Sequence, residues 1–139
     1  MSALTSALAQ QHCSARQVAL SDDEAAQLLT LVPGWSVQHG KLCRTFKFSD
    51  FHRTMAFVDA LAAMIHQQDH HPELTITYQQ CTLRYDTHSV NGGRGGLSDN
   101  DFICAARADV IAQSTIEPST IEQSTIEQST TEQSGTGAA

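Results

Sequence analysis

Two hydrophobic periods alternate along the middle of the chain, and each predicts one type of secondary structure. In three segments the apolar residues lie three or four positions apart, which is the spacing of one face of an α-helix. Each segment begins at a polar capping residue, namely Ser21, Asp50 and Ser98, and the first of these starts a capping box. We therefore expect a short helix to about Leu31, a long helix to about Gln68 and a final helix after Ser98.

Between these helices, apolar and polar residues alternate singly, as they do in strands with one buried face. The alternating runs cover residues 35–38, 42–48, 74–78 and 81–85. The predicted order is α-β-β-α-β-β-α, an α+β fold with a four-stranded antiparallel sheet and helices packed on one face. Such a sheet keeps open edges and one uncovered face, so we expect a homodimer or homotetramer.

The two ends of the chain have a different character from its middle. From Ser114 the sequence repeats five-residue units such as STIEP and STIEQ, a period that fits neither a helix nor a heptad. A tract so rich in Ser, Thr, Glu and Gln buries too little apolar surface to offset its ordering entropy. We expect an N-terminal extension over residues 1–20, one domain over 21–113 and a disordered tail over 114–139.

The charge excludes some classes of function. The formal net charge is −7, and the glutamates of the repeats supply four of those charges. A nucleic-acid binder needs a basic face, so nucleic acid is not an expected partner. No apolar run approaches the roughly 20 residues that span a bilayer, and the first residues do not resemble a signal peptide. The four cysteines are widely spaced, which favours reduced thiols in a cytoplasmic protein.

The strongest chemical signal is a set of histidines near the end of the long helix. The run Asp69-His70-His71-Pro72 must leave the helix, because the residue before a proline avoids the α region. His88 follows the fourth strand, and pairing of adjacent strands can bring it to the same corner. Imidazole changes its charge near pH 6.5, so histidines gathered in one place suggest acid–base chemistry or a metal site.

The residues alone leave three interpretations open. A metal site could use the H-x-x-x-H spacing of His66 and His70 together with His88. The position after His66 is Gln67, so the glutamate of a zinc protease is absent. The histidines could also be surface and capping residues without a shared task. The third interpretation is proton transfer by positioned imidazoles.

A family resemblance favours the third interpretation. The matching residues are Asp69-His70-His71-Pro72, Tyr78, His88 and Gly96-Leu97-Ser98-x-x-Asp101, together with Pro33-Gly34-Trp35, Arg44-Thr45-Phe46 and Asp101-Phe102-Ile103. This pattern resembles the pterin-4a-carbinolamine dehydratases over roughly residues 21–110. The resemblance implies dehydration of 4a-hydroxytetrahydropterin to quinonoid dihydropterin, which regenerates the cofactor of an aromatic amino acid hydroxylase. It implies no metal and no bound cofactor.

The resemblance also implies roles for individual residues. His70 and His88 become the general acid and base, and His71 binds and orients the pterin. Asp101 and His66 become supporting residues, although a carboxylate at position 101 also suits the third residue of a helix capped by Ser98.

The pterin itself is expected to contact Asp69, Thr87 and Ser89. Tyr78 could belong to the core or to the site. The glycine-rich segment 91–96 is expected to be a solvated turn, with Arg94 within reach of a ligand. An alternative function on the same fold is a regulatory module that binds a protein partner, as some mammalian members do for a transcription factor.

Overall fold

The computed structural model describes residues 3–16 and 18–115, so the repeats after Thr115 lie outside the described residues. The helices and strands in chain order are α1 (Ala3–Ala9), α2 (Asp22–Leu29), β1 (Ser36–Gln38), β2 (Lys41–Lys47), α3 (Phe51–Gln68), β3 (Glu73–Ile76), β4 (Gln80–Tyr85) and α4 (Asp99–Thr115). From α2 onward this is the predicted order. No helix among the described residues is long and apolar enough to cross a membrane.

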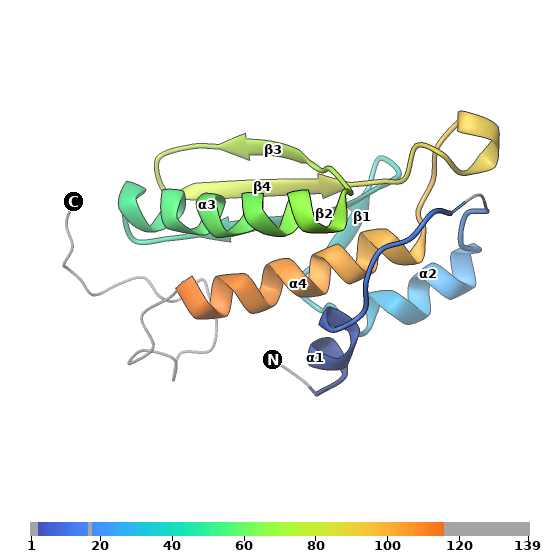
Figure 1. Ribbon diagram of the computed structural model, residues 1–139, viewed down its shortest axis with the longest axis horizontal. Helices are drawn as coiled ribbons and strands as arrows, with labels where there is room; N and C mark the ends of the chain where they lie inside the picture. The colour runs from blue at the N-terminus through green and yellow to red at the C-terminus, as the bar shows by residue number, and fades with distance from the viewer. Residues whose placement is uncertain (1–2, 17, 116–139) are drawn as a thin grey trace.

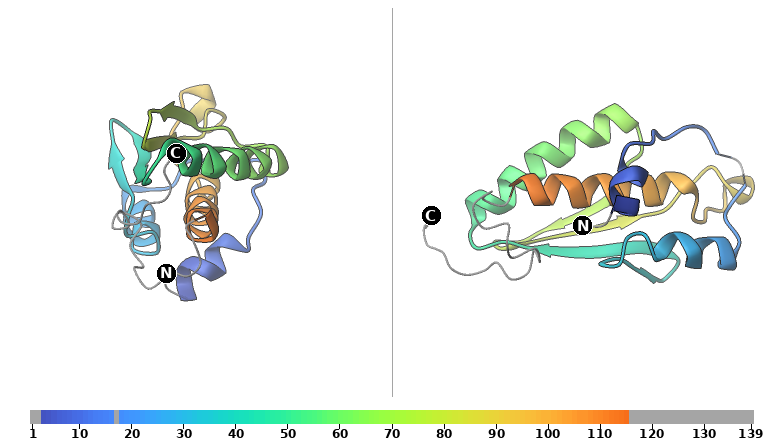
Figure 2. Two further views of the ribbon diagram at one scale, coloured as in Figure 1. Left: turned by 90° about the vertical axis from the view of Figure 1, so that its left-hand side faces the viewer. Right: turned by 90° about the horizontal axis from the view of Figure 1, so that it is seen from below.

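The four strands form one antiparallel sheet in the order β1-β2-β4-β3, with the two longest strands at its centre. The β1–β2 hairpin turns at His39 and Gly40, which both have positive φ, as a tight two-residue turn requires. Helices α3 and α4 lie over the same face of the sheet (Figures 1 and 2). The predicted α+β fold with helices on one face is therefore confirmed.

The core lies between this face and the two long helices. Alternate residues of the central strands point into it, and Phe46, Leu83 and Tyr85 are completely buried. They meet Phe57 and Leu61 of α3, which are also completely buried. The opposite face of the two central strands carries mainly polar side chains, such as Thr45, Thr82 and Arg84, with Cys43 as a buried exception. Period-two alternation in the strands and a helical apolar stripe thus produce a single core.

The predicted helix starts are found in the structure. Ser21 and Glu24 form both hydrogen bonds of a capping box at the start of α2. The carboxylate of Asp50 accepts a hydrogen bond from the backbone N–H of Arg53 at the start of α3. Each cap satisfies backbone donors that the first turn of a helix leaves unpaired.

The N-terminal extension contains a helix that the sequence did not indicate. Helix α1 packs on α4, and its Thr5 and Leu8 are buried (Figure 1). The Thr5 hydroxyl donates a hydrogen bond to the backbone carbonyl of Leu31. Residues 3–16 are therefore attached to the body of the protein, and the domain boundary at residue 21 remains a prediction from sequence.

The third strand is shorter and more exposed than predicted. It ends at Ile76, and Tyr78 lies in the following turn, 62% exposed and stacked on Phe51 at 5.8 Å between ring centroids. Tyr78 therefore belongs neither to the core nor to the histidine site. Leu74 and Ile76 remain partly exposed because β3 is an edge strand. An edge strand has a neighbouring strand on one side only. The alternation of apolar and polar residues does not show which strand lies at the edge.

A buried polar contact joins the start of the sheet to the end of the last helix. Asp109 of α4 accepts hydrogen bonds from Trp35 Nε1 at 2.9 Å and from Arg44 at 3.0 Å. Burial raises the pKa of Asp109 to about 6, although the positive charge of Arg44 opposes this shift. A Cβ at Gly34 would lie 2.3 Å from Arg44 Nη1, so only glycine leaves room for the guanidinium group.

We expect Asp109→Ala to lower the free energy of unfolding by about 2–3 kcal/mol, because it leaves a mostly buried guanidinium and an indole N–H without their acceptor. Urea denaturation followed by tryptophan fluorescence measures the loss. The exposed Asp59 on α3 gives the matched control, and Asp59→Ala should change the free energy by less than about 0.5 kcal/mol. Equal effects of the two substitutions would contradict this account.

Candidate active site

The histidine pair lies where α3 ends and the chain turns toward β3. Asp69 follows the last helical residue in a left-handed conformation with φ 52°, and its backbone N–H still donates to the carbonyl of Ile65. A left-handed residue at this position is a common way to end a helix. Pro72 then keeps His71 out of the helix. The turn therefore presents His70 and His71 at a corner of the fold.

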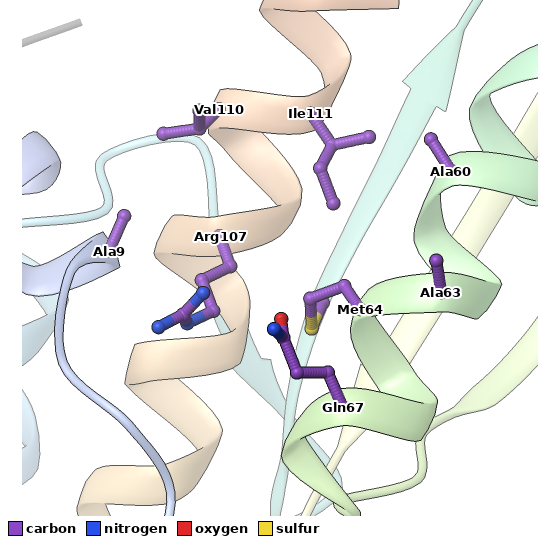
Figure 3. A pocket seen from close by; sticks show the side chains of 8 residues that line it. All are labelled: Ala9, Ala60, Ala63, Met64, Gln67, Arg107, Val110 and Ile111. Carbon is purple, nitrogen blue, oxygen red and sulfur yellow. The ribbon is translucent and has the colours of Figure 1, made fainter.

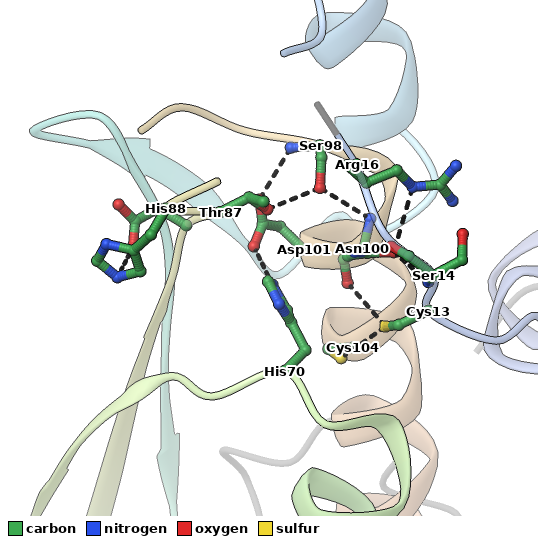
Figure 4. Close-up of polar contacts among 11 residues, drawn as sticks. Cys13, Ser14, Arg16, His70, Thr87, His88, Ser98, Asn100, Asp101 and Cys104 are labelled. Atoms are coloured by element: carbon green, nitrogen blue, oxygen red, sulfur yellow. Dashed lines mark hydrogen bonds and ion pairs between the residues drawn. The ribbon is translucent and has the colours of Figure 1, made fainter. Parts of the chain in front are cut away.

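His70 is paired with the buried carboxylate of Asp101, the residue that the sequence placed in the first turn of α4. His70 Nε2 lies 2.6 Å from Asp101 Oδ1, and the Asp101 side chain is completely buried (Figure 4). The His70 ring is stacked on Tyr85 of β4, with 5.4 Å between centroids and an interplanar angle of 8°. Ring stacking and the hydrogen bond together fix the orientation of this imidazole.

The second oxygen of Asp101 is held by two further donors. Oδ2 accepts a hydrogen bond from the backbone N–H of Ser98 and another from the hydroxyl of Thr87, each at 2.9 Å. The Thr87 and Ser98 hydroxyls are 2.7 Å apart, and the Ser98 hydroxyl accepts from the backbone N–H of Asn100. Asp101 thus caps the helix and binds His70 at the same time.

This network fixes the tautomer of His70. A carboxylate can only accept hydrogen bonds, so the proton between the two residues belongs to Nε2 of the imidazole. Nδ1 is then the nitrogen that can gain or release a proton. Burial by itself would lower the pKa of His70, but the hydrogen bond and negative charge of Asp101 outweigh it, and the pKa is raised above its ordinary value of 6.5.

Six of the eight predicted site residues line one hollow of about 520 Å³, a size typical of small-molecule sites. It is lined by Cys13, Ser14, Ala15, Arg16, Gln68, Asp69, His70, His71, Asp86, Thr87, His88, Ser89 and Asn100. All three histidines that the sequence singled out for catalysis are among these residues. The end of α3, the segment after β4 and the start of α4 therefore meet at this hollow.

His71 and His88 are far more open to solvent than His70. The His71 side chain is 64% exposed and lies 3.9 Å from the carboxylate of Asp69. The His88 side chain is 84% exposed, with its Nε2 3.5 Å from Asp86 Oδ1. Ion pairs at such exposure are weak. Both rings are therefore free to reorient toward a ligand, whereas His70 is held in place.

Four of the expected residues have positions that differ from their expected roles. His66 is exposed on α3 and does not line the hollow. The hydroxyl of Thr87 is hydrogen-bonded to Asp101 and Ser98, so this side chain helps to hold Asp101 in place. The hydroxyl of Ser89 donates to the backbone carbonyl of Arg16. Arg94 of the glycine-rich loop bonds to the Asn91 carbonyl and also lies outside the lining.

Sequence reasoning missed one wall of the hollow. Residues 13–16 come from the N-terminal extension, and their partners in the site are more than 50 positions away in sequence. No local sequence pattern predicts such a long-range contact. Tyr85 could be assigned to the core from its alternation, but its stacking on His70 could not be predicted.

A second hollow of about 430 Å³ lies between α1, α3 and α4 (Figure 3). Its lining consists of Ala9, Ala60, Ala63, Met64, Gln67, Arg107, Val110 and Ile111. It contains no imidazole, carboxylate or thiol, so it offers no group for proton transfer near neutral pH. Within the described part of the chain, no three His, Cys, Asp or Glu side chains are grouped so that they could hold a metal ion.

Comparisons with known proteins agree with the resemblance in the sequence. The family model described as pterin 4 alpha carbinolamine dehydratase matches residues 18–111. A protein of Bdellovibrio bacteriovorus is 46% identical over 100 residues, which cover 72% of this chain and 83% of that protein. One from Xanthomonas campestris is 47% identical over 106 residues, covering 73% of this chain and 86% of that protein. The names of both assign them to the pterin-4-alpha-carbinolamine dehydratases.

A solved structure from Brucella melitensis has the same fold. It is described as a transcriptional coactivator/pterin dehydratase, and it superposes with a TM-score of 0.61 at 28% sequence identity. The match covers 67% of this chain and 97% of the solved chain. Together with the family model, these matches show that the chain belongs to the pterin 4 alpha carbinolamine dehydratase family.

Proposed function

We propose that this protein is a hydro-lyase that dehydrates 4a-hydroxytetrahydropterin to quinonoid dihydropterin by histidine acid–base catalysis. The observation that carries the proposal is an imidazole held in place, His70 on Asp101, in one hollow with the exposed imidazoles of His71 and His88. Family membership supports the same substrate class.

The reaction needs one proton delivered and one removed. The C4a–O bond breaks as the leaving hydroxyl takes up a proton and departs as water, and N5 of the ring loses its proton as the double bond forms. Two positioned groups with pKa values near the working pH can perform these transfers, each typically contributing a factor of 10²–10⁴. The hollow offers imidazoles for both tasks.

His70 suits one transfer because its tautomer and orientation are fixed before a ligand arrives. With Nε2 on Asp101, Nδ1 serves as the atom that accepts or donates the proton. The raised pKa of His70 favours its protonated form, which suits the role of general acid toward the leaving hydroxyl. Asp101 acts through His70 as a positioning residue.

His88 is the proposed partner for the opposite transfer, and His71 the proposed ligand-orienting residue. Their exposure in the free protein leaves room for a bicyclic ring between them and His70. Asp69 and Ser89 line the same hollow and are proposed to contact the pterin. Regeneration of the cofactor of an aromatic amino acid hydroxylase would be the metabolic role, with that enzyme as a possible functional partner and no bound cofactor required.

The open edge of the sheet supports the proposal that the protein self-associates as a dimer or tetramer. Strand β3 exposes Leu74 and Ile76, and the stacked rings of Phe51 and Tyr78 lie at its end. Apolar side chains on an unpaired edge favour pairing with a second copy.

A non-enzymatic role as a partner-binding module is the second candidate. It is favoured by the description of the Brucella melitensis structure as a transcriptional coactivator as well as a dehydratase. Activity measurements on histidine variants separate the two candidates.

We expect His70→Ala and His88→Ala each to lower kcat for chemically generated 4a-hydroxytetrahydropterin by about 10²-fold or more, because each removes one proton transfer. Stopped-flow absorbance of quinonoid dihydropterin formation measures the rate. His52→Ala, an exposed histidine at the far end of α3, serves as the control and should retain wild-type rates. Wild-type protein that gives no acceleration over buffer would leave only the binding role.

We expect Asp101→Asn to bring the pKa of His70 below 6.5, because it removes the charge that raises this pKa and leaves the burial that lowers it. Titration of the imidazole by ¹H–¹⁵N NMR measures both midpoints. In the wild type, the charged pair stabilises the fold below pH 6.5, and this contribution is lost as the pH rises through the higher folded pKa. An unchanged midpoint in the variant would show that Asp101 does not control His70.

A further inference from the structure

The N-terminal segment 12–16, here called the strap, is fastened to all three elements that carry the histidine site. The backbone N–H of Cys13 donates to Gln68 Oε1 at 2.8 Å, and the Ser89 hydroxyl donates to the carbonyl of Arg16 at 2.8 Å. Gln68 precedes the histidine pair, and Ser89 follows His88.

The third fastening is the side chain of Asn100, which directly precedes Asp101. Its amide group donates to the carbonyl of Ser14 at 2.7 Å and accepts from the backbone N–H of the same residue at 3.1 Å. Its Oδ1 also lies 3.3 Å from Arg16 Nε. Asn100 is 5% exposed, so these are protected hydrogen bonds that fix the strap against the start of α4 (Figure 4).

The strap is a wall of the hollow and not only its neighbour. Residues 13–16 all line it, and they lie outside the part of the chain that the family model matches, residues 18–111. Ser14 contributes an exposed hydroxyl, and Arg16 contributes a guanidinium whose ion pair with Asp99, at 3.7 Å, is half exposed and weak. These groups donate hydrogen bonds and suit a hydroxylated ligand.

We propose that the strap binds the polar side chain of the pterin and that Asn100 is the residue that positions it; this rests on the proposed function. In a tetrahydropterin, the side chain is attached to C6, which is bonded to the reacting N5. The histidines act at N5 and at the hydroxyl on C4a. The substituent on C6 therefore projects from the ring next to the atoms on which the histidines act. The strap is the part of the hollow's wall that is hydrogen-bonded to Gln68, near His70 and His71, and to Ser89, next to His88.

The test compares two carbinolamine substrates, one with a polyhydroxyalkyl group and one with a methyl group at C6. We expect Asn100→Ala to raise KM for the polyhydroxylated substrate about tenfold or more, with kcat within about twofold and KM for the methyl substrate nearly unchanged. A wild-type protein without preference, or an equal rise in KM for both substrates, would overturn the proposal.

The matched control is Gln79→Ala. Gln79 also donates a side-chain amide hydrogen bond to a backbone carbonyl, that of Ser49, but it does not line the hollow. It should leave both KM values unchanged. If the wild type proves inactive, the proposed function fails, but the strap is still tested by fluorescence titration with the two dihydropterins. Loss of affinity for only the polyhydroxylated one in Asn100→Ala would support it, and equal affinities would overturn it.

A separate observation concerns the two sulfur atoms where the strap meets α4. Cys13 Sγ lies 3.4 Å from Cys104 Sγ (Figure 4). Cys13 is partly exposed at the hollow, and Cys104 is completely buried. The hydrogen bond with Cys104 lowers the pKa of Cys13 and the same contact raises that of Cys104, so Cys13 is the more acidic thiol of the pair. Thiolate character and access are what make a cysteine react with oxidants.

We infer that peroxide converts Cys13 and Cys104 into a reversible disulfide that fastens the strap covalently to α4. The Cys13 thiolate attacks one peroxide oxygen, the O–O bond breaks, and the sulfur becomes a sulfenic acid as hydroxide leaves and is protonated. The Cys104 thiol then displaces water from that sulfur as the S–S bond forms. Only a small movement of the side chains is needed, since a disulfide has its sulfur atoms about 2 Å apart.

Mass spectrometry after treatment with hydrogen peroxide and alkylation in denaturant tests this inference. We expect a loss of two hydrogens, a crosslinked peptide pair containing Cys13 and Cys104, and reversal by dithiothreitol. Cys13→Ser should abolish the crosslink, whereas Cys43→Ser and Cys81→Ser, which remove other buried thiols, should retain it. Sulfinic acid at Cys13 with Cys104 still alkylated would overturn the inference.

Discussion

The site depends on one buried carboxylate that serves two structural purposes. Asp101 satisfies the first turn of α4 through one oxygen and holds the imidazole of His70 through the other. Because both oxygens accept hydrogen bonds, a movement of the helix start or of the imidazole would remove a donor from a carboxylate buried in the interior. The geometry of the candidate site is thus tied to the stability of a helix, and His70 is held in place beside the two exposed histidines.

The residues that carried the family resemblance divide into two groups in space. The histidines and Asp101 gather at the start of α4, whereas Gly34 and Arg44 lie beside Asp109, about two helical turns further along α4. The second group contributes nothing to the hollow and holds β2 against the helix. A sequence signature of this family therefore contains both the chemistry and the frame that supports it.

Local physics made much of the fold predictable, because alternation, helical spacing and capping residues act over a few positions. The same reasoning placed His70, His71 and His88 at a common corner. It could not foresee that Tyr78 leaves the sheet or that His66 faces solvent, since both depend on where the edge strand and the helix end in space. It also assigned the N-terminal segment to an extension, because every partner of that segment is distant in sequence.

The hydrogen bonds between Ser14 and Asn100 affect the order in which parts of the protein fold. Ser14 and Asn100 are 86 positions apart in the sequence. The N-terminal segment can therefore form these hydrogen bonds only after the start of α4 has been synthesised. During synthesis, the strands and α3 are made before Asn100, the partner of the N-terminal segment. Contacts of such long range are slow to form. A nascent chain that ends before residue 100 lacks both Asn100 and Asp101, so neither the fastening of the N-terminal segment nor the partner of His70 exists at that stage.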